Sequence, residues 1–137
     1  MVAVDLRRLS LFFLRIRALL RNQHDIDIIV ARPNDPQLRT ESVDAVLICN
    51  TYHEFADPAL MLDHTFRALR PGGRLVVVDR ASISSEPPAS TAHEHEVSAA
   101  VVEAELRRKG LQIVSRTDDF IDPPGDEPWS LLVAVRP

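Results

Sequence analysis

An apolar run in the middle of the chain, residues 43–49, restricts the fold more than any other segment. It is VDAVLIC, and Asp44 is its one charged residue. Strands with one face in water alternate apolar and polar residues, whereas strands of parallel sheets are apolar nearly throughout because helices cover both faces. The run therefore predicts a strand buried on both faces in an α/β domain.

The other elements are predicted in the order that an α/β domain requires. Asp57 and Pro58 are a helix-start signal, and Pro71-Gly72-Gly73 is a stop signal. Apolar spacing predicts helices over residues 6–22, 58–70 and 99–110, the last with Ser98 as its cap, and strands over 2–5, 26–31, 43–49, 75–78, 111–116 and 130–135.

The loop between the last two predicted strands contains Pro123, Pro124 and Gly125 and leaves no room for a crossover helix. These two strands should therefore be antiparallel. The sequence as a whole predicts one domain over residues 1–137, with a mostly parallel sheet and a carboxyl-terminal antiparallel strand pair.

The first predicted helix has an apolar face fringed by arginines. The members of this face are Leu9, Phe12, Phe13, Ile16, Leu19 and Leu20. In an α/β domain such a face packs on the sheet, and we expect that here. A helix lying on a membrane surface shows the same pattern, so this alternative stays open. The stretch is too short to cross a bilayer, and Arg15 and Arg17 interrupt it.

Composition excludes several other classes of function. With 16 Lys and Arg against 20 Asp and Glu, the chain has no positive field to attract nucleic acid. Cys49 is the single cysteine, which excludes an intramolecular disulfide and a cysteine zinc site and favours the cytoplasm. The alternating His93-Glu94-His95-Glu96 lacks a third ligand at a recognisable spacing, so we predict no metal site.

Two motifs resemble class I S-adenosylmethionine-dependent methyltransferases, of the type 11-like group. Segment 43–55, VDAVLICNTYHEF, resembles the fourth strand of that family and the loop after it. Segment 68–79, ALRPGGRLVVVD, resembles the family's helix-to-strand turn. Residues 2–5 resemble the second strand, and the resemblance covers almost the whole chain. It implies a Rossmann-like fold, S-adenosylmethionine as cofactor and a small molecule as methyl acceptor.

The resemblance also implies site residues at the carboxyl ends of the strands. Asp5 would bind the cofactor ribose, Asn34 the adenine, and Asn50 and Thr51 would face the methyl donor. His53 is the candidate general base, because imidazole titrates near neutral pH. A capping role for Asp5 and a packing role for His53 stay open as alternatives.

The sequence departs from the family in two ways. Arg32 stands near the place of a common acid in the adenine loop and cannot accept a hydrogen bond, which leaves Asn34 or Asp35 for that contact. In addition, no glycine-rich turn precedes Asp5, and no segment corresponds to the family's first strand. We therefore expect an amino-terminally truncated domain that forms only half of the cofactor pocket.

In the family the absent strand lies between the second and fourth strands. Three arrangements follow: the two flanking strands pair directly, a partner chain donates the strand, or the chain is the end of a longer protein. The last is our expectation. A non-catalytic remnant or interaction module that associates through exposed strand edges is the alternative function.

Overall fold

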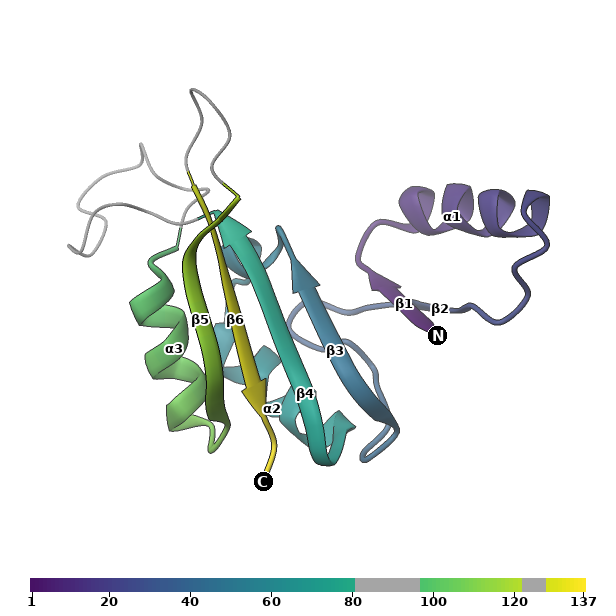
Figure 1. Cartoon of the computed structure of the whole chain (residues 1–137). Helices are drawn as coiled ribbons and strands as arrows, with labels where there is room; N and C mark the ends of the chain where they lie inside the picture. Colours follow the sequence, from purple (N-terminus) through teal and green to yellow (C-terminus); the bar gives the residue numbers. More distant parts are fainter. Residues whose placement is uncertain (81–96, 122–127) are drawn as a thin grey trace.

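The computed structural model describes residues 1–80, 97–121 and 128–137 of the chain (Figure 1). All the predicted helices and strands occur. The segment from His93 to Glu96 and the loop with Gly125 lie outside the described residues. In chain order the elements are β1 (Val2–Asp5), α1 (Arg8–Leu20), β2 (Asp27–Val30), β3 (Val43–Cys49), η1 (Tyr52–Glu54), α2 (Pro58–Ala68), β4 (Leu69–Arg80), α3 (Ala99–Arg108), β5 (Gln112–Ile121) and β6 (Trp129–Val135).

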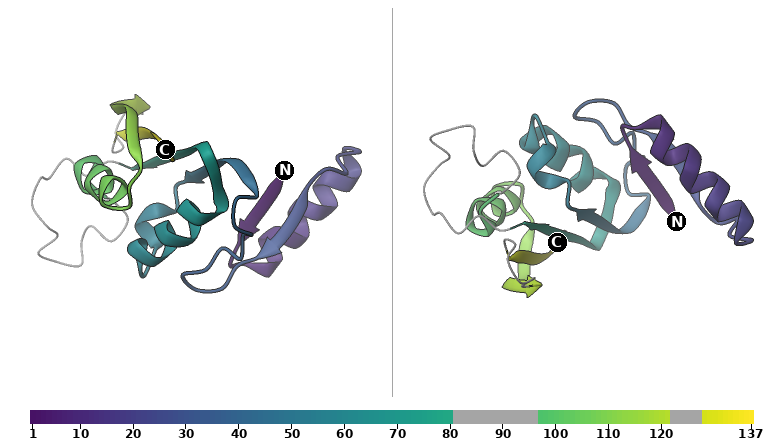
Figure 2. Two further views of the ribbon diagram at one scale, coloured as in Figure 1. Left: turned by 90° about the horizontal axis from the view of Figure 1, so that it is seen from below. Right: turned by 90° about the horizontal axis from the view of Figure 1, so that it is seen from above.

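Four strands form the main sheet, in the order β3-β4-β6-β5. β3 and β4 are parallel, whereas β6 is antiparallel to both β4 and β5. The predicted antiparallel pair at the carboxyl terminus is confirmed, and β6 inserts between β4 and β5. The helices α2 and α3 lie on the same face of this sheet (Figure 2), and the buried core contains Leu62, Leu75, Leu106 and Leu132.

β1 and β2 form a separate parallel sheet of two strands. They lie on the β3 side of the main sheet together with α1, and β1 and β3 run in the same general direction (Figure 1). β1 does not pair with β3. Of the three arrangements that the sequence allowed, direct pairing of the two flanking strands is therefore wrong for the part of the chain that the structure describes.

Within the described residues, β1 and β3 each have one unpaired edge, on the side away from the strand with which each pairs. Ser42 and Asn50 donate their backbone N–H groups to β4-side carbonyls at 2.9 and 2.8 Å, so even-numbered residues of β3 point their backbone groups at β4. Backbone groups alternate in direction along a strand, so Ala45 and Leu47 direct theirs to the opposite side. In β1 the backbone groups of Val2 and Val4 point to the open edge, because the carbonyl groups of the odd-numbered residues accept hydrogen bonds from the β2 side.

The burial of β3 differs from the prediction. Ile48 is buried beneath the helices, but Leu47 is 65% exposed. The reason is that β3 is the edge strand of its sheet, and α2 and α3 cover one face only (Figure 2). The prediction of burial on both faces is wrong for β3 and holds better for β4, where Leu75, Val77 and Val78 are all buried.

The predicted face of α1 is also wrong. Leu11 and Ala18 are the buried residues of this helix, whereas the six residues assigned to the sheet-covering face are 39–83% exposed. Residues seven apart lie on one side of a helix, so a narrow stripe through Leu11 and Ala18 packs on the small sheet. Two strands offer too little surface to cover the wider apolar face.

The Pro71-Gly72-Gly73 turn joins α2 to the regular part of β4. Asp57 caps α2 by accepting a hydrogen bond from the Leu60 N–H at 2.9 Å, as predicted, and the helix ends at Ala68. Gly72 has a φ of 78°, and a Cβ on Gly73 would lie 2.8 Å from the Arg70 carbonyl oxygen. The turn therefore needs glycine at both positions, for different reasons.

Candidate functional site

The segment after β3 carries three of the residues that the sequence selected. Asn50 directly follows the strand and has a φ of 50°, a left-handed conformation that asparagine tolerates better than most residues. The Thr51 hydroxyl donates a hydrogen bond to the Cys49 carbonyl oxygen at 2.8 Å. Both side chains are on exposed residues. They therefore lie at the carboxyl end of a parallel strand, where α/β sheets collect ligands.

His53 lies on the short helix η1 and contacts Asp79 at the carboxyl end of β4. Its Nδ1 atom is 2.7 Å from one carboxylate oxygen, and its backbone N–H donates to the other oxygen at 3.2 Å. The Arg80 backbone N–H donates to the first oxygen at 2.8 Å. The side chains of His53 and Asp79 are only 6% and 1% exposed. This contact is thus enclosed, and Asp79 holds His53 through both its ring and its backbone.

Tyr52 fastens the other side of η1. Its ring is 2% exposed, and its hydroxyl donates a hydrogen bond to the Glu105 carboxylate on α3. Burial raises the pKa of the Tyr52 phenol well above its usual range, and the bond to Glu105 and the negative charge of Glu105 raise it further; the Arg108 charge opposes them. Tyr52 is therefore neutral at all ordinary pH values and acts as an anchor.

Asp5 ends β1 and is half-buried. Its Oδ1 accepts a hydrogen bond from the Arg7 backbone N–H at 2.8 Å. The capping residue of α1 is Arg7, so Asp5 closes a local turn before the helix and does not cap it. A carboxylate has further lone pairs, so this bond fixes the side chain at the strand end and leaves acceptor capacity for a ligand.

Asn34 lies apart from the other selected residues. It has a φ of 63° in the turn that Arg32 and Asp35 close with reciprocal backbone hydrogen bonds. Asp35 then turns towards α2, where its carboxylate lies 3.7 Å from His64. Among the hydrogen bonds and ion pairs described for this part of the chain, none joins Asn34 to Asn50 or Thr51.

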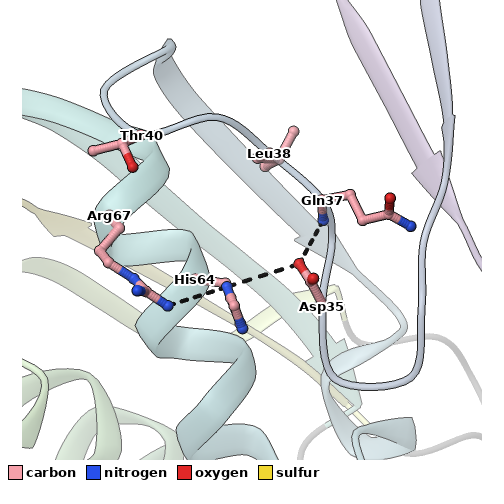
Figure 3. A pocket seen from close by; sticks show the side chains of 6 residues that line it. All are labelled: Asp35, Gln37, Leu38, Thr40, His64 and Arg67. Atoms are coloured by element: carbon pink, nitrogen blue, oxygen red, sulfur yellow. Dashed lines mark hydrogen bonds and ion pairs between the residues drawn. The ribbon is translucent and has the colours of Figure 1, made fainter.

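A polar cavity of about 360 Å³ opens between this loop and α2 (Figure 3). His64 contacts both the Arg67 guanidinium, at 3.2 Å, and Asp35 there. The lining residues are Asp35, Gln37, Leu38, Thr40, His64 and Arg67. Of the residues that the sequence singled out, Asp35, the alternative to Asn34 for the adenine contact, lines this cavity.

The sequence did not identify Asp79 or Glu105 as functional residues. Asp79 is the last residue of segment 68–79, which was selected for its Pro71-Gly72-Gly73 turn. Its partner His53 is 26 positions away. Glu105 is 53 positions from Tyr52. A carboxylate directly after a buried apolar strand was the available signal for Asp79. Within the described residues, no group of three or more His, Cys, Asp or Glu side chains is arranged to hold a metal ion.

Residues 1–77, more than half of the chain, match the family model for a methyltransferase domain. The chain belongs to this methyltransferase family. No curated protein matches it. Across the described part of the chain, no helix combines the length and the apolar character needed to span a membrane.

Solved structures of similar fold include several S-adenosylmethionine-dependent methyltransferases. One from Aquifex aeolicus is 16% identical with a TM-score of 0.78, and the match covers 98% of this chain and 67% of that one. The [4+2]-cyclase SpnF is 15% identical with a TM-score of 0.85, and the match covers 99% of this chain and 65% of that one. The geranyl diphosphate C-methyltransferase of Streptomyces coelicolor, solved with S-adenosyl-L-homocysteine, is 16% identical with a TM-score of 0.77, and the match covers 98% of this chain and 64% of that one.

These likenesses confirm the Rossmann-like fold, and they confirm S-adenosylmethionine as the cofactor at the level of the family. The chain spans about two thirds of the length of these three structures. Each match covers almost the whole chain and therefore includes both sheets. The two sheets are placed relative to each other as in a single larger fold.

The described residues fit part of S-adenosylmethionine. Asp5 offers a fixed carboxylate for hydroxyl groups, and Asn50 and Thr51 offer polar groups at the end of β3. The described glycines lie elsewhere: Gly72 and Gly73 are near the start of β4, and Gly110 follows α3. The ribose side of the cofactor therefore has candidate contacts here, and a glycine turn for its methionine part does not occur at the carboxyl edge of the described strands.

Proposed function

We propose that the chain serves methyl transfer from S-adenosylmethionine to a small-molecule acceptor, as a partial methyltransferase domain that covers residues 1–137. The observation that carries this proposal is the cluster at the carboxyl ends of β3 and β4. There Asn50, Thr51 and His53 follow one parallel strand, and Asp79 is the residue before the last in the other, β4. Ligands of open α/β sheets bind at this edge, and family membership gives the ligand its identity.

Each side chain has a proposed task. Asp5 binds the ribose hydroxyls, and Asn34 contacts the adenine. Asn50 and Thr51 line the side of the pocket next to the methyl group. His53 takes the proton of the acceptor. The cofactor supplies an activated methyl group, so the protein mainly has to align the acceptor with it. This chemistry requires no covalent nucleophile.

The acceptor and the compartment are also part of the proposal. Two of the similar structures are methyltransferases named for small molecules, 1,6-didemethyltoxoflavin and geranyl diphosphate. These names support an acceptor of that size. The net charge of −4 argues against a polyanionic substrate. We place the protein in the cytoplasm because it has a single cysteine.

Calorimetric titration of S-adenosylmethionine into the chain tests the proposal. We expect binding weaker than micromolar, because the described strands have no glycine turn at their carboxyl edge to enclose the methionine part. Asp5→Asn and Asn50→Ala should each weaken it by about tenfold, as expected for a lost hydrogen bond to a polar ligand group. Asp44→Asn is the control, because Asp44 lies at the amino end of β3, away from the site, and its carboxylate contacts only the exposed Arg70 among the pairs observed. Binding that ignores both site variants would refute the assigned positions.

A second function is favoured by a different observation, the facing open edges of β1 and β3. An interaction module that accepts an added strand would use those edges through main-chain hydrogen bonds. Such a module would associate, with itself or with another chain, without binding the cofactor. A calorimetric titration with no heat, together with a molar mass above that of the monomer in sedimentation analysis, would favour this function over methyl transfer.

A further inference from the structure

The helix α1 packs on the small sheet through one narrow stripe, formed by Leu11 and Ala18, and exposes its other apolar side. Successive residues of a helix are about 100° apart, so Leu9 and Leu20 lie about half a turn around the helix from that stripe. We call this side the outer face of α1. It consists of six apolar residues that are 39–83% exposed: Leu9, Phe12, Phe13, Ile16, Leu19 and Leu20.

An apolar outer face is unusual for a helix that packs on a sheet. Such helices normally turn polar residues away from the sheet, and helices of one layer contact each other through their flanks. A further helix beside α1 would therefore contact a flank and leave the outer face open. Figures 1 and 2 show α1 at the opposite end of the molecule from α3. The outer face is thus accessible to a partner from outside the fold.

Arginines lie along both borders of the outer face. By helical spacing, Arg8 and Arg15 occupy the border on one side. Arg17 and Arg21 occupy the border on the other side. All four are exposed, and residues 6–24 contain no Asp or Glu that could neutralise them within the helix. The helix is therefore a cationic region in a chain whose net charge is −4.

A lipid surface with anionic headgroups matches both features of this helix. It offers an apolar interior to the outer face and phosphate groups to the arginines, whose aliphatic stems can cover further apolar surface. Nucleic acid offers phosphates but no apolar interior for six such residues. A second copy of the chain would offer a matching apolar face, but it would bring two sets of arginines together. Charge therefore favours the lipid surface.

We propose that α1 is an interfacial helix that holds the protein on an anionic lipid surface. The helix lies in the plane of the surface, with its outer face at the boundary between headgroups and acyl chains and its arginines at the lipid phosphates. The contact is peripheral and reversible, because it depends on one short helix. This inference goes beyond methyl transfer and does not depend on it.

Flotation of the 137-residue chain with phospholipid vesicles is the first test. The protein should float with vesicles of phosphatidylcholine and phosphatidylserine, and it should stay behind with phosphatidylcholine alone. Raising the ionic strength from about 0.1 M to 1 M should weaken the binding, because the Debye length falls from about 10 Å to 3 Å. Equal binding to both kinds of vesicle overturns the proposal. So does a lack of binding by the folded chain, which would leave the outer face to a protein partner.

Phe13→Gln tests the apolar part of the contact. Phe13 is 65% exposed on the outer face, so the fold does not require it, and circular dichroism should be unchanged. The variant should lower the vesicle partition coefficient by about tenfold or more, as expected when a buried phenyl ring is lost. Phe120→Gln is the matched control, since Phe120 is 49% exposed on β5. Equal effects of the two variants overturn the proposal.

Arg17→Gln tests the charged part. Each arginine near an anionic surface contributes about fivefold to the partition coefficient, and we expect a loss of that size. Arg74→Gln, at an exposed position of β4, changes the net charge equally and should leave binding within about twofold of the unsubstituted chain. A loss in Arg74→Gln as large as in Arg17→Gln overturns the assignment to α1, because net charge alone would then explain the binding.

Sedimentation of the chain without vesicles examines the second copy as occupant. A dimer that Phe13→Gln dissociates, together with an absence of vesicle binding, assigns the outer face to self-association and overturns the proposal. Titration with S-adenosylmethionine separates this inference from the proposed function. If the cofactor does not bind while the vesicle results are as expected, methyl transfer by this chain fails and the lipid contact stands.

Discussion

Tyr52 and Glu105 join the turn after β3 to α3, through a hydrogen bond from the phenol to the carboxylate. The two residues are 53 positions apart, and the phenol is enclosed by the core. The bond therefore ties the segment that carries His53 to a helix on the face of the main sheet. Two predictions follow from this one contact.

Alkaline pH should destabilise the protein through Tyr52. Burial, the Glu105 bond and the Glu105 charge raise the pKa of the phenol in the folded state. A group with a raised folded pKa stabilises the fold fully below its unfolded pKa, which is about 10 for tyrosine, and this contribution is lost as pH rises beyond that value. Tyr52 is the only tyrosine, so phenolate absorbance at 295 nm reports on it alone. The absorbance should rise together with unfolding by circular dichroism, and a rise in the folded protein at pH 10 would contradict the burial argument.

Replacing Tyr52 by phenylalanine should lower the free energy of unfolding by about 1 kcal/mol, the usual contribution of one hydrogen bond. The ring and its packing against Phe55 are retained in this variant. Urea unfolding at neutral pH measures the change. The variant should also lose the alkaline transition assigned to the phenol, and a variant that keeps it would show that another group is responsible.

Alanine at Gly73 should be more disruptive than alanine at Gly72. A Cβ at Gly73 meets two backbone carbonyl oxygens, of Arg70 at 2.8 Å and of Asp44 at 3.2 Å, and backbone cannot rotate away. At Gly72 the space is open, and the cost comes only from the φ of 78°. We expect losses of about 2–4 kcal/mol and about 1 kcal/mol respectively. Equal midpoints for the two variants in thermal unfolding would be inconsistent with this turn geometry.

Leu47→Pro should distinguish the role of the open edge of β3 from the role of its paired edge. The Leu47 N–H points away from β4, so proline there removes a donor only from the open edge, where strands tolerate proline. Proline at Val46 removes an N–H that faces β4 and should unfold the sheet. If strand addition at this edge drives self-association, Leu47→Pro should remain folded and lose the associated species in sedimentation analysis. Association that persists in a folded Leu47→Pro would exclude this edge.

The single cysteine offers a direct report on the proposed pocket. Cys49 is exposed and precedes Asn50 and Thr51, and its carbonyl oxygen accepts the Thr51 hydroxyl. A ligand at the carboxyl end of β3 should therefore slow maleimide labelling of Cys49 several-fold at saturating S-adenosylmethionine. Adenine alone is the matched control, since it lacks the methyl-bearing part. Labelling at the same rate with and without S-adenosylmethionine would place the cofactor elsewhere.

Local signals predicted those parts of the fold that short-range chemistry controls. Asp57 and Pro58 begin α2 because a side-chain oxygen satisfies a free N–H and because proline needs no N–H at that position. Ser98 is the capping residue of α3 by position, but its side chain makes no capping bond. Sequence patterns located this helix start correctly and could not determine the rotamer.

Of the candidate site, the sequence predicted only the residues that follow one another directly after β3. Asn50, Thr51 and His53 were found because they directly follow an apolar strand. Asp79 and Glu105 were missed as their partners because hydrogen bonds across 26 and 53 positions depend on strand register and helix docking. The ribose role of Asp5 and the adenine role of Asn34 stay predictions.

The sequence by itself determined the family, the order of helices and strands and the antiparallel ending, because each depends on periodicity, caps and turns that act over a few residues. The tertiary structure alone decided which apolar surfaces are covered. β3 has the composition of an interior strand and lies at an edge, and α1 packs through Leu11 and Ala18 while its wider apolar face is exposed. Burial depends on which other elements pack against a residue. A sequence pattern shows only that the residue is suited to being buried.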